Sequence, residues 1–242
     1  MEEEREQQLL ALLRCAAAGM PTARQELQQY AGGPIVALPA HEVRDTLQKV
    51  LLGQDPETVL LLAGTGALCN FGLAGVRWPL PLARLPAQML LRWWGLLLAC
   101  GARSAPVVEA FGFSAGFGSD LARLNRLYFA PAPGTLAQLK LQLREPLPQD
   151  AGEVFAAFAA LDERFAPRLA LYEALRESGE PYTLEMLAIR PASLLALGVP
   201  QRKVAPLREL LLDAVLRGPQ LNRYDSLAAL AMQLAPFVGG GK

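Results

Sequence analysis

One pentapeptide of the chain has the spacing of a hydrolase nucleophile, because residues 112–116 read Gly-Phe-Ser-Ala-Gly. In that chemistry a strand leads into the serine, and a histidine that follows the serine along the chain acts as its base. The one histidine of the chain, His41, precedes Ser114, and the residues on both sides of the motif favour helix. We therefore interpret the pentapeptide as a glycine-rich loop between helices.

The chain also lacks the residues that phosphoryl transfer and metal binding require. Gly32 and Gly33, upstream of Arg44 and Asp45, superficially resemble elements of a nucleotidyltransferase, but a two-metal site needs converging carboxylates and the chain has no Asp-x-Asp pair. The glycines of residues 64–66 lack the rest of a dinucleotide fingerprint. Three cysteines without a Cys-x-x-Cys spacing do not indicate a zinc site. The sequence therefore predicts no catalytic residue, no metal site and no cofactor.

The elements that would position any site are helices almost throughout. Leu, Ala, Glu, Gln and Arg dominate the chain, alternating β-branched residues are missing, and the hydrophobic share of 52% is enough for a packed core. We expect an all-α fold. The apolar spacing and the capping residues predict helices over 5–18, 41–52, 56–62, 85–100, 106–111, 119–129, 135–143, 152–163, 167–178, 183–189, 191–197 and about 202–217. In the last of these, Val204, Leu207, Leu211 and Val215 form the predicted buried stripe.

Charge is balanced overall and segregated locally. Lys and Arg number 23, as do Asp and Glu, which excludes a basic or acidic tail as the general character of the chain. Residues 77–144 contain eight basic side chains and two acidic ones, and residues 190–223 contain six and two. This segregation indicates an anionic partner for the two segments, although solvated helix faces explain it equally well.

The N-terminal sequence Met-Glu-Glu-Glu-Arg-Glu is acidic and lacks the features of a signal peptide. The most apolar stretch, residues 93–102, is about half the length that a membrane span requires. The odd number of cysteines fits a reducing compartment. We expect a cytoplasmic protein without a membrane partner.

Two stretches of the chain resemble the class II, bacterial-type family of CCA-adding enzymes and poly(A) polymerases. Residues 38–52 read Leu-Pro-Ala-His-Glu-Val-Arg-Asp-Thr-Leu-Gln-Lys-Val-Leu-Leu. Together with residues 56–68, they are similar to the neck helices that follow the catalytic head of that family. Residues 182–223, which include Leu-Ala-Leu-Gly-Val-Pro at 195–200, are similar to its C-terminal helical hairpin.

The resemblance implies an elongated array of short helices in neck, body and tail subdomains. The expected division is a helical extension at 1–29, neck-like helices at 30–80, a helical body at 81–180, a tail-like hairpin at 181–236 and a disordered end at 237–242.

The chain also departs from that family. The sequence has no nucleotidyltransferase head before the neck, so the metal-binding carboxylates and nucleotide-templating residues of the family have no counterpart. Leu98 and Ala99 stand where related phosphohydrolases carry a His-Asp pair, and residues 200–205 lack both glycines of the family's Pro-Gly-x-x-Ile-Gly motif. The resemblance therefore implies that this chain is not an enzyme, and that any tRNA nucleotidyltransferase activity would need a head on another chain.

In the family, these regions hold the acceptor arm of tRNA by its backbone. We therefore expect a head-less, non-catalytic relative that binds tRNA or similar structured RNA, with a separate nucleotidyltransferase head as a further candidate partner. The alternative is a helical protein-interaction scaffold that has lost RNA binding, which the zero net charge and the missing glycines favour. A hydrolase on the same body is opposed by the single histidine. The predicted RNA contacts are Arg190, Arg202, Lys203, Arg208 and Arg223, with residues 202, 203 and 208 expected to point outward.

Overall fold

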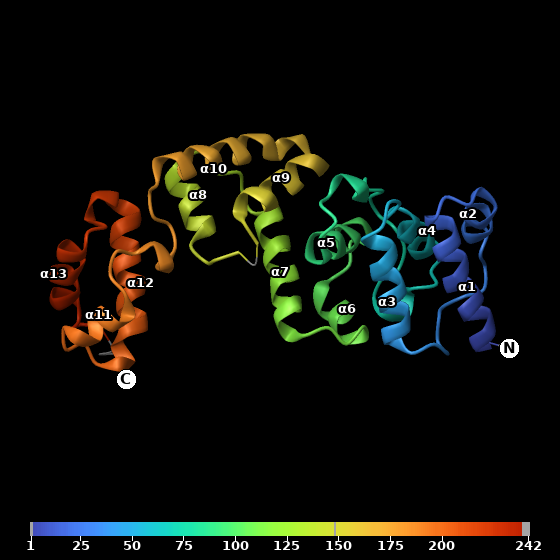
Figure 1. Ribbon diagram of the computed structural model, residues 1–242, viewed down its shortest axis with the longest axis horizontal. Helices are drawn as coiled ribbons and strands as arrows, with labels where there is room; N and C mark the ends of the chain where they lie inside the picture. The colour runs from blue at the N-terminus through green and yellow to red at the C-terminus, as the bar shows by residue number, and fades with distance from the viewer. Residues whose placement is uncertain (1, 148, 239–242) are drawn as a thin grey trace. The chain divides into compact units, whose positions relative to one another are not determined.

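The computed structural model describes residues 2–147 and 149–238 of the chain (Figure 1). Within these ranges there are thirteen α-helices and five short 3-10 helices, and no strand. The all-α prediction is confirmed. No helix in the described ranges is long and apolar enough to cross a membrane.

The described residues divide into two compact units. The first unit comprises residues 2–130 and 153–164, and the second comprises residues 131–152 and 165–238. The boundaries expected at 80 and 180 both fall inside a unit. At the first of them, the backbone N–H groups of Arg77 and Trp78 both donate to the carbonyl oxygen of Ala99, so the proline-rich segment after them is attached to a helix of the same unit.

The first unit contains eight α-helices and two 3-10 helices. They are α1 (Glu2–Ala17), α2 (Pro21–Gln28), α3 (Ala40–Leu51), α4 (Thr58–Gly64), η1 (Cys69–Phe71), η2 (Leu82–Arg84), α5 (Met89–Cys100), α6 (Ser104–Ala110), α7 (Ala115–Phe129) and nearly all of α9 (Ala151–Leu161), and the 3-10 helix η3 (Glu163–Phe165) begins at its end. Helix α5 is buried from Leu90 to Cys100, as its almost uninterrupted apolar sequence requires. At Gly95 a Cβ atom would lie 2.5 Å from Leu85 Cδ1, so glycine lets η2 and the residues after it pack against α5.

Two buried charged side chains hold loops of the first unit. Glu6, in α1, accepts hydrogen bonds of 2.8–2.9 Å from the backbone N–H groups of Val36, Ala37 and Leu38. Arg92, in α5, donates to the carbonyl oxygens of Leu85, Pro86 and Leu51. Burial lowers the pKa of Arg92, and these carbonyl groups supply the partners that a buried guanidinium needs. The two side chains thus satisfy backbone groups that no helix would pair.

The second unit begins after α7 and is resumed after α9. Its helices are α8 (Leu136–Leu143), α10 (Ala166–Ser178), the 3-10 helix η4 (Leu184–Met186), α11 (Pro191–Ala196), α12 (Gln201–Arg217), the 3-10 helix η5 (Pro219–Leu221) and α13 (Tyr224–Leu234). The helices η4 and α13 differ from expectation. The helix expected over 183–189 is only the short η4, and α13, like α2 in the first unit, was not among the predicted helices.

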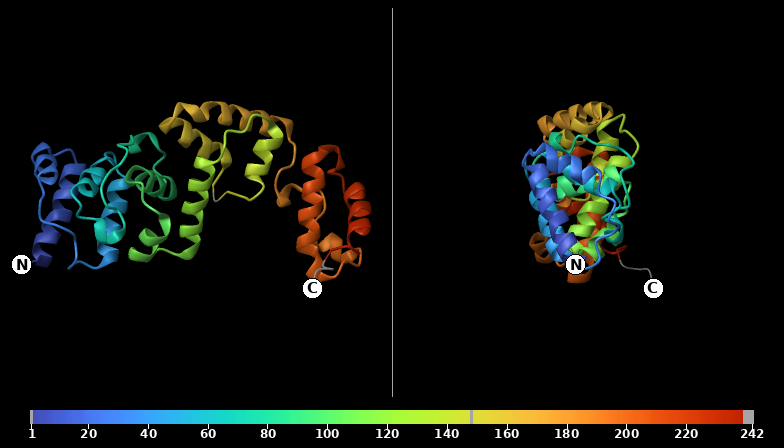
Figure 2. Two further views of the ribbon diagram at one scale, coloured as in Figure 1. Left: turned by 180° about the vertical axis from the view of Figure 1, so that it is seen from behind. Right: turned by 90° about the vertical axis from the view of Figure 1, so that its right-hand side faces the viewer.

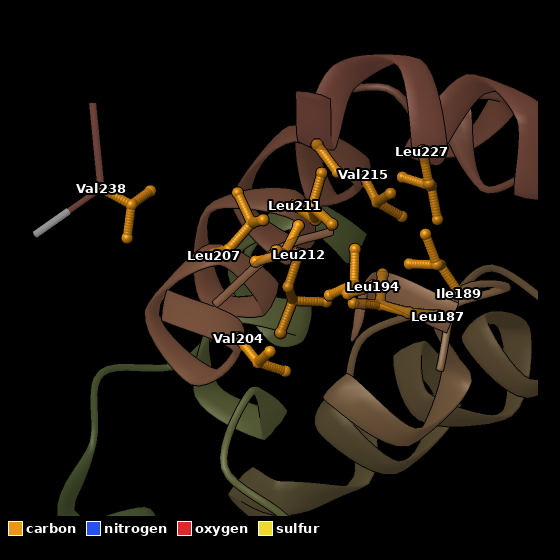
Figure 3. Close-up of a cluster of buried hydrophobic side chains, with 12 residues drawn as sticks. Leu187, Ile189, Leu194, Val204, Leu207, Leu211, Leu212, Val215, Leu227 and Val238 are labelled. Atoms are coloured by element: carbon orange, nitrogen blue, oxygen red, sulfur yellow. The ribbon is translucent and has the colours of Figure 1, made fainter. Parts of the chain in front are cut away.

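The C-terminal part of the second unit has an aliphatic core, which we name the C-terminal cluster (Figure 3). The predicted stripe of α12 is buried in this cluster, as the periodicity requires. Helices α12 and α13 lie side by side and run in opposite directions (Figures 1 and 2). The cluster consists of Leu187, Ile189, Leu194, Val199, Val204, Leu207, Leu211, Leu212, Val215, Leu227, Ala231 and Val238. The disorder expected for 237–242 falls mostly on 239–242, which lie outside the described residues, but Val238 is buried in the cluster.

Candidate nucleic-acid interface

Of the predicted RNA contacts, Arg202, Lys203 and Arg208 belong to α12, Arg223 follows it after η5, and Arg190 directly precedes α11. With 17 residues, α12 is about 25 Å long. Arg202 lies in the first turn of α12, is exposed, and forms no side-chain hydrogen bond or ion pair with any part of the chain that the structure describes. The residue before the helix is Pro200, which offers no side-chain cap, and no acidic residue lies in the first turn. The backbone N–H groups at this end of α12 and the guanidinium of Arg202 are therefore positive together.

Lys203 and Arg208 are less free than the sequence suggested. Lys203 Nζ donates a 2.8 Å hydrogen bond to the carbonyl oxygen of Ala235, directly after α13. Arg208 donates to the carbonyl oxygen of Leu184. Both side chains are half-buried, so the expectation that they point outward is wrong for them. The physical reason is that the carbonyl groups at a helix end and in a 3-10 turn need donors, and these two cations supply them.

Asn222, which follows α12 and η5, connects the segment before Arg190 to the segment that carries Arg223. Asn222 accepts a 2.8 Å hydrogen bond from the backbone N–H of Ala188 and donates one of 3.0 Å to the carbonyl oxygen of Met186. Arg190 is two residues from Ala188, and Arg223 is next to Asn222. Both arginines are exposed and form no side-chain hydrogen bond or ion pair within the described ranges.

Arg217 is a further exposed arginine, at the C-terminal end of α12, and the sequence analysis did not select it as a contact. Its Nε donates to the carbonyl oxygen of Asp213, one turn earlier, and it lies in the last turn of α12. A basic residue there compensates the helix dipole, so its position has a sufficient structural explanation. The signal that could have identified it was its place among the six basic residues of 190–223.

The two acidic side chains of α12, Glu209 and Asp213, form ion pairs with an arginine at the end of α8. Arg144, at the end of α8, lies 2.6 Å from Glu209 and 2.7 Å from Asp213. The hydrogen bond with Glu209 is the main reason why the pKa of Arg144 is raised. Two exposed carboxylates, Glu185 and Asp225, also belong to this part of the chain. The surface is therefore a mixed one in which the exposed arginines outnumber the exposed acids.

The motifs that resemble catalytic elements serve packing and capping. Ser114 is the N-cap of α7, and its hydroxyl oxygen accepts a hydrogen bond from the backbone N–H of Phe117. Leu98 and Ala99 are buried in α5, and burial raises the pKa of the neighbouring Cys100 thiol to about 11. In the described ranges, no three His, Cys, Asp or Glu side chains gather where they could hold a metal ion.

The arrangement at α12 can attract an anion and donate hydrogen bonds to it, and its arginines have the planar fork that suits phosphate oxygens. Its exposed cations stand at two ends of one helix, so a ligand that engages both must extend over about 25 Å. Comparison of the chain with protein-family models, with curated proteins and with solved structures finds no match.

Proposed function

We propose that this chain binds structured RNA, such as tRNA, through the phosphate backbone, with the C-terminal part of the second unit as the contact surface. The observation that carries the proposal is the exposure of Arg190, Arg202 and Arg223 without side-chain partners among the described residues. An arginine whose guanidinium has no hydrogen-bond partner within the protein can make bidentate contacts with phosphate. By its resemblance to the tail of CCA-adding enzymes, the chain is a non-catalytic relative that acts alone or with a head on another chain.

A phosphate-binding role agrees with the spacing of these cations. Base edges in an RNA duplex are poorly accessible, so duplex RNA is recognised by shape and by its phosphates and 2′-hydroxyl groups. Such recognition needs cations at separate points along a surface, and the ends of α12 provide two such points about 25 Å apart. With both glycines of the family's hairpin motif absent, the contacts would come mainly from side chains, and affinity should fall steeply with salt.

Exposed apolar side chains favour the second candidate function, a protein-interaction scaffold. Leu195, Leu210 and Met232, on α11, α12 and α13, are each exposed despite their size. Scattered exposed leucines are common on protein surfaces, so this observation is weaker than the unpaired arginines.

The test compares two double variants that change the charge equally. Arg190→Glu/Arg223→Glu reverses the predicted contacts, and Arg14→Glu/Arg176→Glu reverses two exposed arginines elsewhere. The first variant should reduce tRNA affinity at least tenfold and lower the slope of log K against log salt by about two. The control should bind as the parent does. Equal binding by all three proteins would remove this surface from consideration, and the absence of any salt-dependent tRNA binding by the parent would favour the scaffold.

A further inference from the structure

A hollow of about 690 Å³ lies in the first unit, whereas the arginines of α12 belong to the second. Its walls come from the segment between η1 and η2, from α5, from the end of α7 and from the end of α9. It is lined by Trp78, Leu80, Leu98, Tyr128, Phe129, Leu161, Asp162, Glu163 and Arg164. Binding pockets for small organic ligands have this volume and this composition, an apolar lining with a few polar groups on one side.

Two aromatic side chains of this hollow are far more exposed to solvent than the other large aromatic side chains of the unit. Trp78 is 52% exposed and Phe129 is 63% exposed, whereas Trp93 and Trp94 are buried. Exposed rings of this size, side by side with leucines, leave apolar surface in water that a flat ligand would cover.

The exposed rings are nevertheless held in place. The backbone N–H of Trp78 donates to Ala99 at 3.0 Å, and its indole packs on Gly101, where a Cβ would lie 3.3 Å from the ring. Gly101 has a φ of +62°, so glycine serves both the turn and this close approach. The ring of Phe129 meets that of Tyr128 edge to face, with 5.2 Å between centroids. The hollow is therefore formed before a ligand arrives.

The polar side of the hollow carries an ion pair. Arg164 Nε lies 2.9 Å from one carboxylate oxygen of Asp162 and 3.0 Å from the other, while the arginine side chain stays exposed. The hydrogen bond from Arg164 lowers the pKa of Asp162, so this carboxylate is ionised at neutral pH. It can accept a hydrogen bond from an amino group, and the guanidinium of Arg164 can stack on a ring or contact a phosphate.

Further cations surround the rings. Arg77 is exposed next to Trp78, and a Cβ on Gly101 would lie 2.6 Å from its Cδ atom. Arg84 is exposed in an adjoining hollow that shares Leu161, Asp162 and Glu163 with the first. With Arg164, three cations lie in or beside the two hollows together with the carboxylates of Asp162 and Glu163, which favours a ligand that is aromatic and anionic together.

We infer that this hollow binds an unpaired nucleobase of an RNA strand, stacked on Trp78 and Phe129, with Arg77, Arg84 and Arg164 near the adjacent phosphates. Aromatic and guanidinium surfaces are the usual platforms for unpaired bases, because every base has a flat π-face. The inference rests on the proposed RNA binding and adds that the chain distinguishes unpaired from paired nucleotides.

The test uses the fluorescence of Trp78, which is the exposed one of the three tryptophans. A single-stranded adenylate of about six nucleotides should quench the parent protein, and an RNA duplex of the same length should quench it less. Trp78→Phe should abolish the quench but retain most of the affinity, measured by anisotropy of a labelled strand. Trp78→Ala and Phe129→Ala should each weaken binding about tenfold. Met20→Ala, which removes an exposed apolar side chain from another part of the first unit, is the control and should leave binding unchanged.

The outcomes separate this inference from the proposed function. If Trp78→Ala and Phe129→Ala bind the single strand as the parent does, the base site is refuted, while reduced tRNA binding by Arg190→Glu/Arg223→Glu would still support the backbone interface. If an aromatic peptide quenches Trp78 and the adenylate does not, the hollow serves a protein partner and the inference is overturned. Arg164→Lys should retain more affinity than Arg164→Gln, because it keeps the charge and loses only the planar fork.

Discussion

The first unit and the C-terminal cluster are both built from helices, but they differ in whether charged side chains are buried in the core. In the first unit two charged side chains, Glu6 and Arg92, are buried and saturated with backbone partners, and the core around α5 is rich in aromatic rings. The C-terminal cluster contains only Leu, Ile, Val and Ala side chains. The exposed arginines of this part of the chain, among them Arg202 and Arg217 in the first and last turns of α12, lie outside this core.

This difference shows two ways in which the segments between helices are held in place. The first unit contains extended segments, such as residues 36–38, whose N–H groups have no helical partner, so a buried carboxylate orders them. In the C-terminal cluster the connections are short and helices supply most of the backbone hydrogen bonds. Arg190, Arg202 and Arg223 in this part of the chain form no side-chain hydrogen bond or ion pair within the described ranges, whereas Glu6 and Arg92 of the first unit are committed to the fold.

The largest expected effect follows from removing Glu6. Glu6→Ala leaves three backbone N–H groups without their acceptor in a buried place, and we expect the first unit to lose about 4 kcal/mol of its free energy of unfolding. Urea titration followed by tryptophan fluorescence measures this, because all three tryptophans belong to the first unit. Glu3→Ala, in the same helix and exposed, should change the stability by less than about 0.5 kcal/mol. Similar losses from both variants would contradict the role assigned to Glu6.

An intermediate effect is expected for the C-terminal cluster. Leu211 is fully buried, and Leu211→Ala should cost about 3 kcal/mol through lost burial and the cavity that remains. Hydrogen exchange of the α12 amides should accelerate accordingly, while exchange in α5 stays as in the parent. The adjacent Leu210 is exposed, so Leu210→Ala is a matched control that should leave α12 protected. Faster exchange in both α5 and α12 would mean that the two cores unfold together.

The smallest effect is expected for the ion pairs between α8 and α12. Arg144→Gln removes the cation shared by Glu209 and Asp213, whose side chains are partly exposed, so solvent screening limits the loss to about 1 kcal/mol or less. The difference between variant and parent in thermal unfolding should shrink further in 1 M salt. A loss that is large and independent of salt would show that Arg144 acts by packing.

Much of the fold was predictable where local chemistry decides it. Thr135 caps a helix with its side chain, Gly179 and Gly198 end helices at positive φ, and the stripe of α12 is buried as its spacing indicates. The expected start of α7 at 119 was wrong, because Ser114 caps the helix and it begins at Ala115, inside the predicted loop. Helix α13 was not predicted, because Arg223 provides no side-chain cap and the helix is stabilised by contacts with α12.

The candidate site was predictable only in part. The number of basic residues could be counted from the sequence. Whether the side chain of a given lysine forms a hydrogen bond within the protein depends on residues distant in the sequence. Lys203 donates to the carbonyl oxygen of Ala235, and Asn222 connects the segment before Arg190 to the segment that carries Arg223. The hollow at Trp78 had no sequence signal either, since its lining comes from four separate segments.

The division of the chain into units has a consequence for how the protein is made. The chain passes between the units three times, after residues 130, 152 and 164, and α9 itself crosses one of these points. During synthesis from the N-terminus, residues 131–152 of the second unit emerge before residues 153–164 complete the first. An incomplete piece of the second unit therefore leaves the ribosome before the first unit is complete, and no single truncation point separates the two units.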